Sequence, residues 1–144
     1  MIDPTTDRRD MDALLDQLLA FARDMLRKQG TVHPFGAVTK ADGRMKLVAS
    51  SGAGQASPDE LMGLVVSGLR EQALAGEIRA CGIAYEVQVP TDLGETTEAI
   101  AVSLEDVLGE SALVYMPFTR GRFNSVKFDE ITVSAGQPRV FVAA

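Results

Sequence analysis

Two residues are the natural candidates for nucleophilic chemistry, since Cys81 is the only cysteine and His33 the only histidine. A thiol next to an imidazole is a common nucleophile–base pair. Cys81, however, lies on the apolar side of an alternating segment, where a thiol is buried, neutral and inert. His33 precedes Pro34, which favours extended backbone at the entry to a strand. We therefore predict a core cysteine and a strand-entry histidine, not a catalytic pair.

Carboxylates gather between Thr91 and Glu110, where no basic residue intervenes. Such oxygen ligands suit a divalent cation. The spacing matches no calcium loop, and alternation along a strand would spread the ligands apart. We predict a solvated acidic face and no metal site. The acidic residues are Asp92, Glu95, Glu98, Glu105, Asp106 and Glu110.

A Gly-x-Gly segment, Gly52-Ala53-Gly54, stands ahead of an expected helix and invites comparison with a phosphate-binding loop. No Lys-Ser/Thr pair follows it, and Asp59 with Glu60 would repel a phosphate at the helix start. We predict a flexible connection and no cofactor site.

The segment from Met116 to Asn124 is the strongest candidate for an interaction surface. Arginine and aromatic side chains are enriched at the energetic centres of protein interfaces. A basic turn on an acidic protein would suit an acidic partner, including the Thr91–Glu110 region of another copy. Two alternatives stay open: a solvated turn with both phenylalanines in the core, or stacking on single-stranded nucleic acid. The candidate residues are Phe118, Arg120, Arg122 and Phe123.

Composition limits the class of protein. The 144 residues carry a formal net charge of −6, and 46% are hydrophobic. This favours a single domain over residues 1–144, with residues 1–9 frayed. The negative charge argues against nucleic-acid binding, and no apolar run is long enough for a membrane helix. A polar, acidic start and a single cysteine favour a reducing cytoplasm.

Residues 57–90 predict a capped helix followed by a long strand. Ser57 is a good N-cap, Glu60 can complete a capping box, and Gly76 can end the helix. Gly63 and Gly68 lie inside this helix, where they predict close packing against a sheet or another helix. From Arg79 to Val89 the period is two, and Pro90 ends the strand.

This strand has two different faces. Its core face carries Cys81, Ile83, Tyr85, Val87 and Val89. Its other face carries Ala80, Gly82, Ala84, Glu86 and Gln88. The second face is small at its start and polar at its end. We therefore expect a helix to pack closely against the small residues at the start of this face and the polar residues at its end to face solvent.

The remaining elements follow from periodicity and turn residues. We expect a helix from Asp10 to Gly30, a hairpin around Asp42-Gly43, and a polar loop over Thr91–Glu98. Further strands are expected around Ile100–Leu104, Ala112–Phe118 and Val140–Val142, the last at a sheet edge. Val126–Phe128 and Ile131–Val133 are out of phase across Asp129-Glu130, which indicates either a bulge or two short strands. The fold class is α+β, with an antiparallel sheet of five or more strands and two main helices, in the order α-β-β-α-β-β-β-β. The helices are expected to cover one face or one end of the sheet.

The first half resembles a known family. A helix, then Gly36-Ala37-Val38-Thr39-Lys40-Ala41-Asp42-Gly43-Arg44-Met45-Lys46-Leu47-Val48-Ala49-Ser50, then a helix looks like the roadblock family of dynein light-chain-like proteins. The resemblance covers about half the chain. It implies a profilin-like sandwich that dimerises and docks on small GTPases or their scaffolds. Otherwise the chain looks like small uncharacterised bacterial α+β proteins, a likeness that implies no activity.

The residues favour a non-catalytic protein–protein interaction module over an enzyme, because no catalytic constellation, cofactor fingerprint or metal-ligand set stands out. Self-association into a homodimer is part of this expectation. The rival is a small-ligand-binding protein or enzyme that uses carboxylates in a cleft, which a deep pocket lined by Tyr85, Glu86 or the acidic loop would favour. A third alternative is a toxin-neutralising partner protein.

Overall fold

The computed structural model describes residues 4–49 and 57–141. Two long helices and seven strands follow one another in the order that the sequence predicts. Their bounds are α1 Pro4–Gln29, β1 Phe35–Lys40, β2 Met45–Ala49, α2 Pro58–Leu74, β3 Ile78–Pro90, β4 Thr96–Asp106, β5 Ser111–Arg120, the 3-10 turn η2 Arg122–Asn124, β6 Val126–Phe128 and β7 Thr132–Ala135. The α+β class is confirmed.

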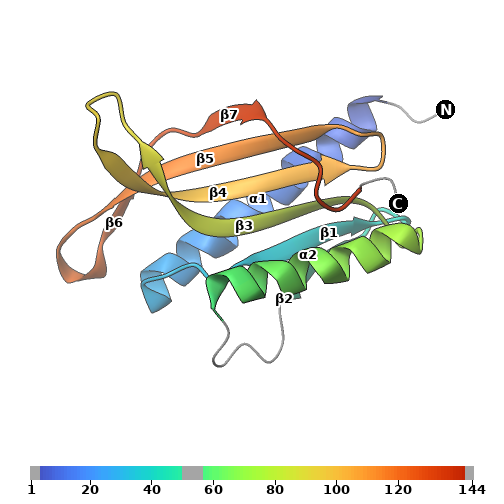
Figure 1. Ribbon diagram of the computed structural model, residues 1–144, viewed down its shortest axis with the longest axis horizontal. Coiled ribbons are helices and arrows are strands. Elements are labelled where there is room, and N and C mark those ends of the chain that lie inside the picture. The colour runs from blue at the N-terminus through green and yellow to red at the C-terminus, as the bar shows by residue number, and fades with distance from the viewer. Residues whose placement is uncertain (1–3, 50–56, 142–144) are drawn as a thin grey trace.

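All strand pairs among residues 4–49 and 57–141 are antiparallel, and the order across the sheet is β2-β1-β3-β4-β5-β6, with β7 also pairing with β5. Strands β3, β4 and β5 form the expected meander, which short connections favour (Figure 1). The segment after β5 forms two separate short strands, so of the two alternatives, a bulge or two short pieces, the second is observed. Strand β6 pairs at Phe118–Arg120, and β7 pairs at Ala112–Tyr115.

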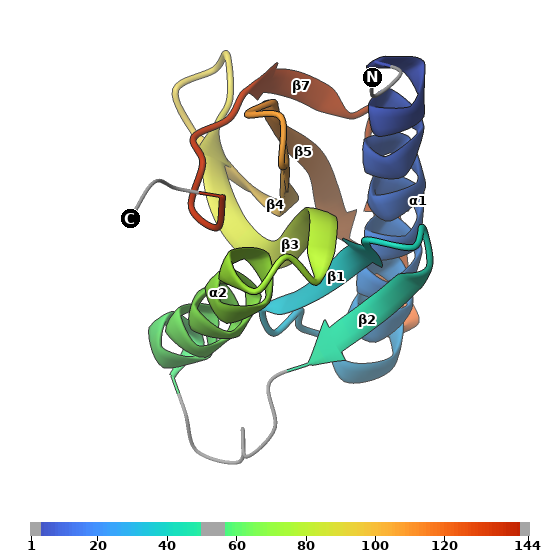
Figure 2. The ribbon, with the colours of Figure 1, turned by 90° about the vertical axis from the view of Figure 1, so that its right-hand side faces the viewer.

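The two helices lie on opposite faces of the sheet, so the expectation of one covered face or end is wrong (Figure 2). Helix α1 packs on the face that carries Ala37, Ala80 and Ala84. Helix α2 packs on the other face, where Cys81 and Ile83 are buried. Because β1 and β3 are apolar on both sides, each can support a helix on either face.

Strand β3 has the two faces that its alternation predicts, although on the expected core face only Cys81 and Ile83 are buried, while Tyr85, Val87 and Val89 are half-buried. A Cβ placed on Gly82 would lie 2.5 Å from Leu18 Cδ1 and 2.8 Å from Leu104 Cδ2. The small residues on the Gly82 face of β3 therefore allow α1 to pack closely against the sheet. At the far end of the same face Glu86 is half-buried and Gln88 is exposed, as expected.

Helix α2 begins and ends as its sequence indicates. Ser57 Oγ accepts the backbone N–H of Glu60 at 3.2 Å. At the other end Gly76 has a φ of 71°, and the N–H of Glu77 bonds to the carbonyl of Gln72 at 3.0 Å. This is the Schellman arrangement that a glycine permits.

Gly63 and Gly68 do not mark close packing in this structure. Among the described residues, a Cβ on either one would meet no neighbouring atom within 4 Å. The prediction was wrong because α2 faces the sheet with Leu61, Val65 and Leu69, whereas Gly63 lies off that stripe and Gly68 lies at its edge. The close glycine contact on this side is Gly36 of β1, whose Cβ would lie 3.3 Å from Val65 Cγ1.

Two expected boundaries move. Helix α1 begins at Pro4 rather than Asp10, which agrees with the preference of proline for the first helical turn. Strand β4 begins at Thr96, so the polar loop after Pro90 is a shorter turn than expected. No helix in residues 4–49 and 57–141 is long and apolar enough to cross a membrane.

The prediction of an edge strand at Val140–Val142 is also wrong for Val140 and Phe141, the two of its residues that the structure describes. Arg139, Val140 and Phe141 form no strand. Their three backbone N–H groups donate instead to the carboxylate of Glu105, at 2.9, 2.9 and 2.8 Å. Val140 is buried in the α2 core. We call residues 139–141 the C-terminal strap.

Candidate interaction surface

The candidate surface is a hairpin that projects from one end of the sheet, formed by the end of β5, η2 and β6 (Figure 1). We call residues 118–128 the Arg/Phe hairpin. Its tip is closed by the N–H of Gly121, which donates to the carbonyl of Ser125 at 2.8 Å, and by the N–H of Ser125, which donates to the carbonyl of Arg122 at 3.1 Å. These bonds give the projecting tip a defined backbone shape.

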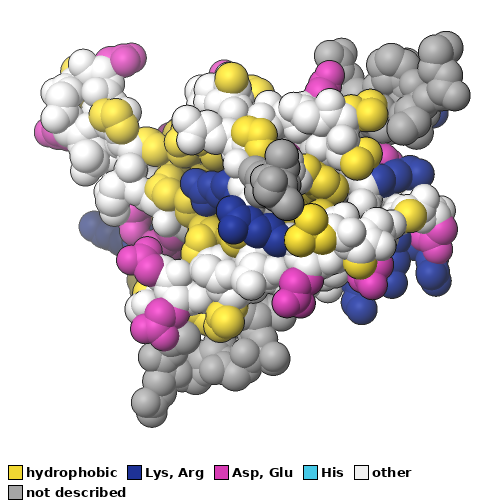
Figure 3. All heavy atoms as spheres, turned by 45° about the vertical axis from the view of Figure 1, so that its right-hand side comes forward, with side chains coloured by type: hydrophobic (Ala, Val, Ile, Leu, Met, Phe, Trp, Pro, Cys, Tyr) yellow, Lys and Arg dark blue, Asp and Glu magenta, His cyan; other side chains and the backbone are white. Residues whose placement is uncertain are grey.

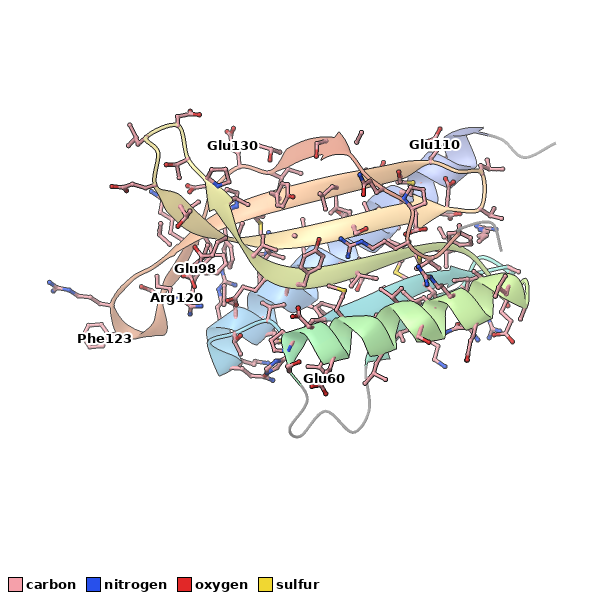
Figure 4. The ribbon with its side chains drawn as sticks, viewed as in Figure 1. Glu60, Glu98, Glu110, Arg120, Phe123 and Glu130 are labelled. Carbon is pink, nitrogen blue, oxygen red and sulfur yellow. The ribbon has the colours of Figure 1, made fainter. Side chains whose placement is uncertain are left out.

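Arg120 fixes the base of the hairpin to three other segments. Its guanidinium donates to both carboxylate oxygens of Glu98, at 2.8 and 3.2 Å, and to the carbonyl of Gly30 at 2.8 Å. One of its nitrogens lies 3.9 Å from a carboxylate oxygen of Glu86. The hydrogen bond to Glu98 raises the pKa of Arg120. The bidentate geometry with Glu98 holds the guanidinium in one orientation (Figure 4).

Aromatic contacts support the same base from within. Phe118 is 1% exposed, and its ring centroid lies 6.2 Å from that of Phe128. The guanidinium of Arg120 lies 5.4 Å from the Phe118 ring, and that of Arg27 lies 5.2 Å from the Phe128 ring. Cation–π and ring contacts of this kind add to the area buried, so the base is attached to both β4 and α1.

The tip presents Phe123 to solvent. Its side chain is 98% exposed and points away from the rest of the molecule (Figure 4). Its backbone has a φ of 57°, and no other non-glycine residue in the described chain has a positive φ. A bulky side chain in this conformation costs about 1–2 kcal/mol. The tip therefore combines an unburied aromatic ring with a strained backbone, as functional segments often do.

The structure separates the four residues that the sequence grouped. Phe118 belongs to the core and Arg120 to the base of the hairpin, while Phe123 and Arg122 are exposed at the tip. The alternative with both phenylalanines in the core is thus wrong for Phe123. Sequence periodicity could not separate them, because the chain reverses direction between the two phenylalanines.

The acidic region divides in the same way. Asp92, Glu95 and Glu110 are exposed, as a solvated face requires, and Glu98 is half-buried against Arg120. Glu105 and Asp106 are only 3% and 2% exposed, so for them the prediction of a solvated face was wrong.

The two buried carboxylates make structural contacts. Glu105 holds the C-terminal strap. Oδ1 of Asp106 accepts the N–H groups of Leu108 and Glu110 in the following turn, both at 3.0 Å. Burial raises the pKa of Asp106. Within residues 4–49 and 57–141, no group of three or more His, Cys, Asp or Glu is arranged to hold a metal ion.

The remaining candidates for chemistry are not brought together. Cys81 is 1% exposed in the α2 core, and burial raises the pKa of its thiol far above the usual range. His33 is exposed before β1. The two make no hydrogen bond in the described part of the chain, so a nucleophile–base pair is absent there. Gly52-Ala53-Gly54 lies outside the described residues.

Two surface pockets are lined by residues that the small-ligand alternative names. One, of about 470 Å³, lies where the start of α2 meets β3 and is lined by Tyr85, Glu86, His33 and Arg139 among others. The other, of about 500 Å³, lies beside the β3–β4 turn and is lined by Asp92, Tyr115 and Asp129 among others. In the first, the guanidinium of Arg139 lies 5.9 Å from the ring of Tyr85. These linings mix apolar and polar groups, as ligand sites commonly do.

The face beside α2 shows how the strap alters the surface. Basic side chains gather in its middle with hydrophobic side chains around them (Figure 3). Arg70 of α2 donates from Nε to the carbonyl of Arg139 at 2.5 Å. This contact joins α2 to the strap, and the sequence does not reveal it because Arg70 and Arg139 are distant along the chain.

Comparison with known proteins adds no relative. No protein-family model, curated protein or solved structure matches this chain.

Proposed function

We propose that the protein is a non-catalytic interaction module that docks a protein partner through the tip of the Arg/Phe hairpin. The observation that carries the proposal is Phe123, a phenylalanine that is 98% exposed and held in a left-handed conformation. Exposing a large aromatic ring gives up burial worth about 2 kcal/mol. Insertion into a partner's pocket would recover that free energy.

The anchored base supports this proposal. Arg120 is bound by Glu98, Gly30 and the ring of Phe118, so the tip needs little ordering when it docks. A preorganised segment loses less entropy on binding than a mobile one. Arg122 is exposed beside Phe123. The partner that fits is therefore a protein with an apolar pocket bordered by acidic groups.

We expect Phe123→Ser to weaken such a complex by about 30-fold, the equivalent of about 2 kcal/mol at an interface hot spot. Partners are captured on the tagged protein and identified by mass spectrometry, and the strongest is then titrated by calorimetry. Leu93→Ser is the matched control, because Leu93 is 88% exposed at the β3–β4 turn. Equal binding by both variants would contradict the proposal.

A second variant separates binding from folding. Phe123→Gly relieves the positive φ, so it should keep the stability of the native protein or raise it by up to about 1 kcal/mol. It should nevertheless lose the partner, because the ring is gone. Arg120→Glu is unsuitable for this purpose, since it would disrupt the base of the hairpin.

Three further expectations belong to this proposal. The resemblance to the roadblock family supports docking on small GTPases or their scaffolds and formation of a homodimer. A buried single cysteine fits the cytoplasm, where thiols remain reduced. The formal charge of −6 disfavours nucleic acid as the partner.

A small-ligand function is the second candidate, favoured by the pocket of about 470 Å³ beside Tyr85. Met62 and Tyr85 supply apolar surface there, while His33 and Arg139 supply donors. Glu86 accepts the N–H of Val32 at 3.1 Å, which makes it a positioning group more than a free base.

Thermal-shift screening with small organic acids and amines tests this candidate. A ligand of the pocket should raise the melting temperature of the wild-type protein but not that of Tyr85→Ala. Tyr115→Ala, in the other pocket, is the control and should respond as the wild type does. A library without any stabilising compound, or equal shifts in the wild type and Tyr85→Ala, would speak against it.

A further inference from the structure

The outer edge of β2 is open. Strand β2 ends the sheet order, and in residues 4–49 and 57–141 it pairs with β1 alone. An edge strand presents a row of N–H and C=O groups that can pair with another strand. Many proteins protect such edges with charged side chains, proline or a bulge. Here the five-residue strand Met45–Ala49 carries a single charge, at Lys46.

Large apolar side chains border this edge on the α1 side. Met45 and Leu47 are 39% and 40% exposed. Leu47 pairs with Ala37, which belongs to the α1 core, so both side chains lie on the α1 face of the sheet.

Helix α1 also carries an exposed apolar side chain. Phe21 is 42% exposed. It lies about 120° around the helix from Arg27, whose guanidinium contacts the Phe128 ring of β6.

The α2 side of the edge is charged and open. Glu60, Leu64, Gly68 and Gln72 are spaced by four and share one flank of α2. Gln72 lines a hollow together with Lys46, so this flank faces β2. Leu64 is 54% exposed, and in the part of the chain that the structure describes a Cβ on Gly68 would meet no neighbouring atom within 4 Å.

The charges on this side complement each other. Lys46 and Glu60 form no salt bridge within the described residues. Glu71, three residues after Gly68, is also exposed and unpaired there. Every copy of the chain carries Lys46 on β2 and the carboxylates of Glu60 and Glu71 on α2. Two copies can therefore pair the lysine of one with the carboxylates of the other.

We propose that a second copy of this chain pairs with β2 through an antiparallel, two-fold contact centred on Leu47. In this register Leu47 lies opposite Leu47 of the second copy, and Lys46 lies opposite Val48. The two Lys46 side chains are then diagonal rather than directly opposed, which limits their repulsion. Lys46 of the second copy enters the open flank beside Gly68, near Glu60 and Glu71. A two-fold contact of this kind is self-complementary and closed.

The inference gives a surface to the self-association that belongs to the proposed function, but it does not depend on the Arg/Phe hairpin. Strands β2 and β6 lie at opposite ends of the sheet order. Pairing through β2 therefore leaves both hairpins free, one at each outer end of a continuous sheet.

Cysteine cross-linking tests the register. Cys81 is buried, so Leu47→Cys introduces the accessible thiol. Directly opposed residues of an antiparallel pair have Cα atoms about 4.5–5.5 Å apart, which a disulfide can span. Mild oxidation should yield a covalent dimer of Leu47→Cys. Lys46→Cys should not cross-link, and neither should Val133→Cys, whose position on β7 is 63% exposed.

Sedimentation equilibrium tests the affinity. We expect the wild-type protein to be a dimer at about 100 µM, and Leu47→Lys and Lys46→Glu each to raise the dissociation constant at least about tenfold. Circular dichroism should show both variants folded. A monomeric wild type, or equal cross-linking of Leu47→Cys and Val133→Cys, would overturn the inference.

The two proposals fail independently. Phe123→Ser should remain dimeric, and Leu47→Lys should still bind the hairpin's partner. If Leu47→Lys dimerises normally while Phe123→Ser loses its partner, the β2 contact is wrong and the hairpin proposal stands. If Leu47→Lys fails to dimerise while Phe123→Ser keeps its partner, the hairpin proposal is wrong and the β2 contact stands.

Discussion

Replacing Glu105 by glutamine is expected to release the C-terminal strap and to cost about 2–4 kcal/mol of folding free energy. The carboxylate is 3% exposed and accepts three backbone N–H groups, from Arg139, Val140 and Phe141. Hydrogen bonds to a charged acceptor contribute about 1.5–3 kcal/mol each. Glutamine removes the charge and replaces one of the two carboxylate oxygens by an NH₂ group. Because an NH₂ group cannot accept a backbone N–H, at least one of the three hydrogen bonds is lost.

Two local measurements check this prediction. Amide hydrogen exchange at residues 139–141 should accelerate in Glu105→Gln. The thiol of Cys81, which lies opposite Glu105 in the β3–β4 pairing, should react faster with a disulfide reagent once Val140 leaves the α2 core. Glu110→Gln, at an exposed position of the next turn, is the control. Unchanged exchange and thiol reactivity would show that the strap does not depend on the carboxylate.

Gly82→Val should destabilise the protein by about 3 kcal/mol or more, and Gly82→Ala by about 1–3 kcal/mol. The new Cβ would lie 2.5 Å from Leu18 Cδ1, 2.8 Å from Leu104 Cδ2 and 3.3 Å from the carbonyl oxygen of Ser103. Leu18 and Leu104 are themselves buried, at 0% and 3% exposure. Neither can move without displacing its own neighbours, so α1 has to shift away from the sheet.

Denaturant unfolding measures this cost against a control of opposite sign. Gly63→Ala replaces a helical glycine whose Cβ would meet nothing within 4 Å, and it should stabilise the protein by about 0.5–1 kcal/mol. In a Leu18→Ala background the cost of Gly82→Ala should shrink, because the clashing methyl group is absent. A Gly82→Ala variant as stable as the wild type would show that the close approach of α1 is not required.

The elements could be predicted from the sequence because their signals are local. Ser57, Gly76 and the Asp42-Gly43 turn define ends and reversals within a few residues. The two faces of β3 follow from its alternation alone. The order of helices and strands and the α+β class followed from such signals, although α1 and β4 both start earlier than their patterns indicate.

Contacts between distant segments could not be predicted in this way. Glu105 alternates with Leu104, which suggested a solvated position. Its burial depends on the strap, which lies 34–36 residues further along the chain. For the same reason the sequence could not show which of the four candidate surface residues are buried and which are exposed. Composition identified the Arg/Phe turn, but only the pairing of β5 with β6 separates buried Phe118 from exposed Phe123.

Strand β3 lies in both cores at once, since Ala80 and Ala84 contact the α1 side while Cys81 and Ile83 contact the α2 side. Loss of this strand would therefore dissolve both hydrophobic layers together. We expect neither layer to persist as an intermediate without the other, so heat and denaturant should unfold the chain in one cooperative transition. A destabilising substitution on either side of the sheet should then lower the melting temperature of this single transition.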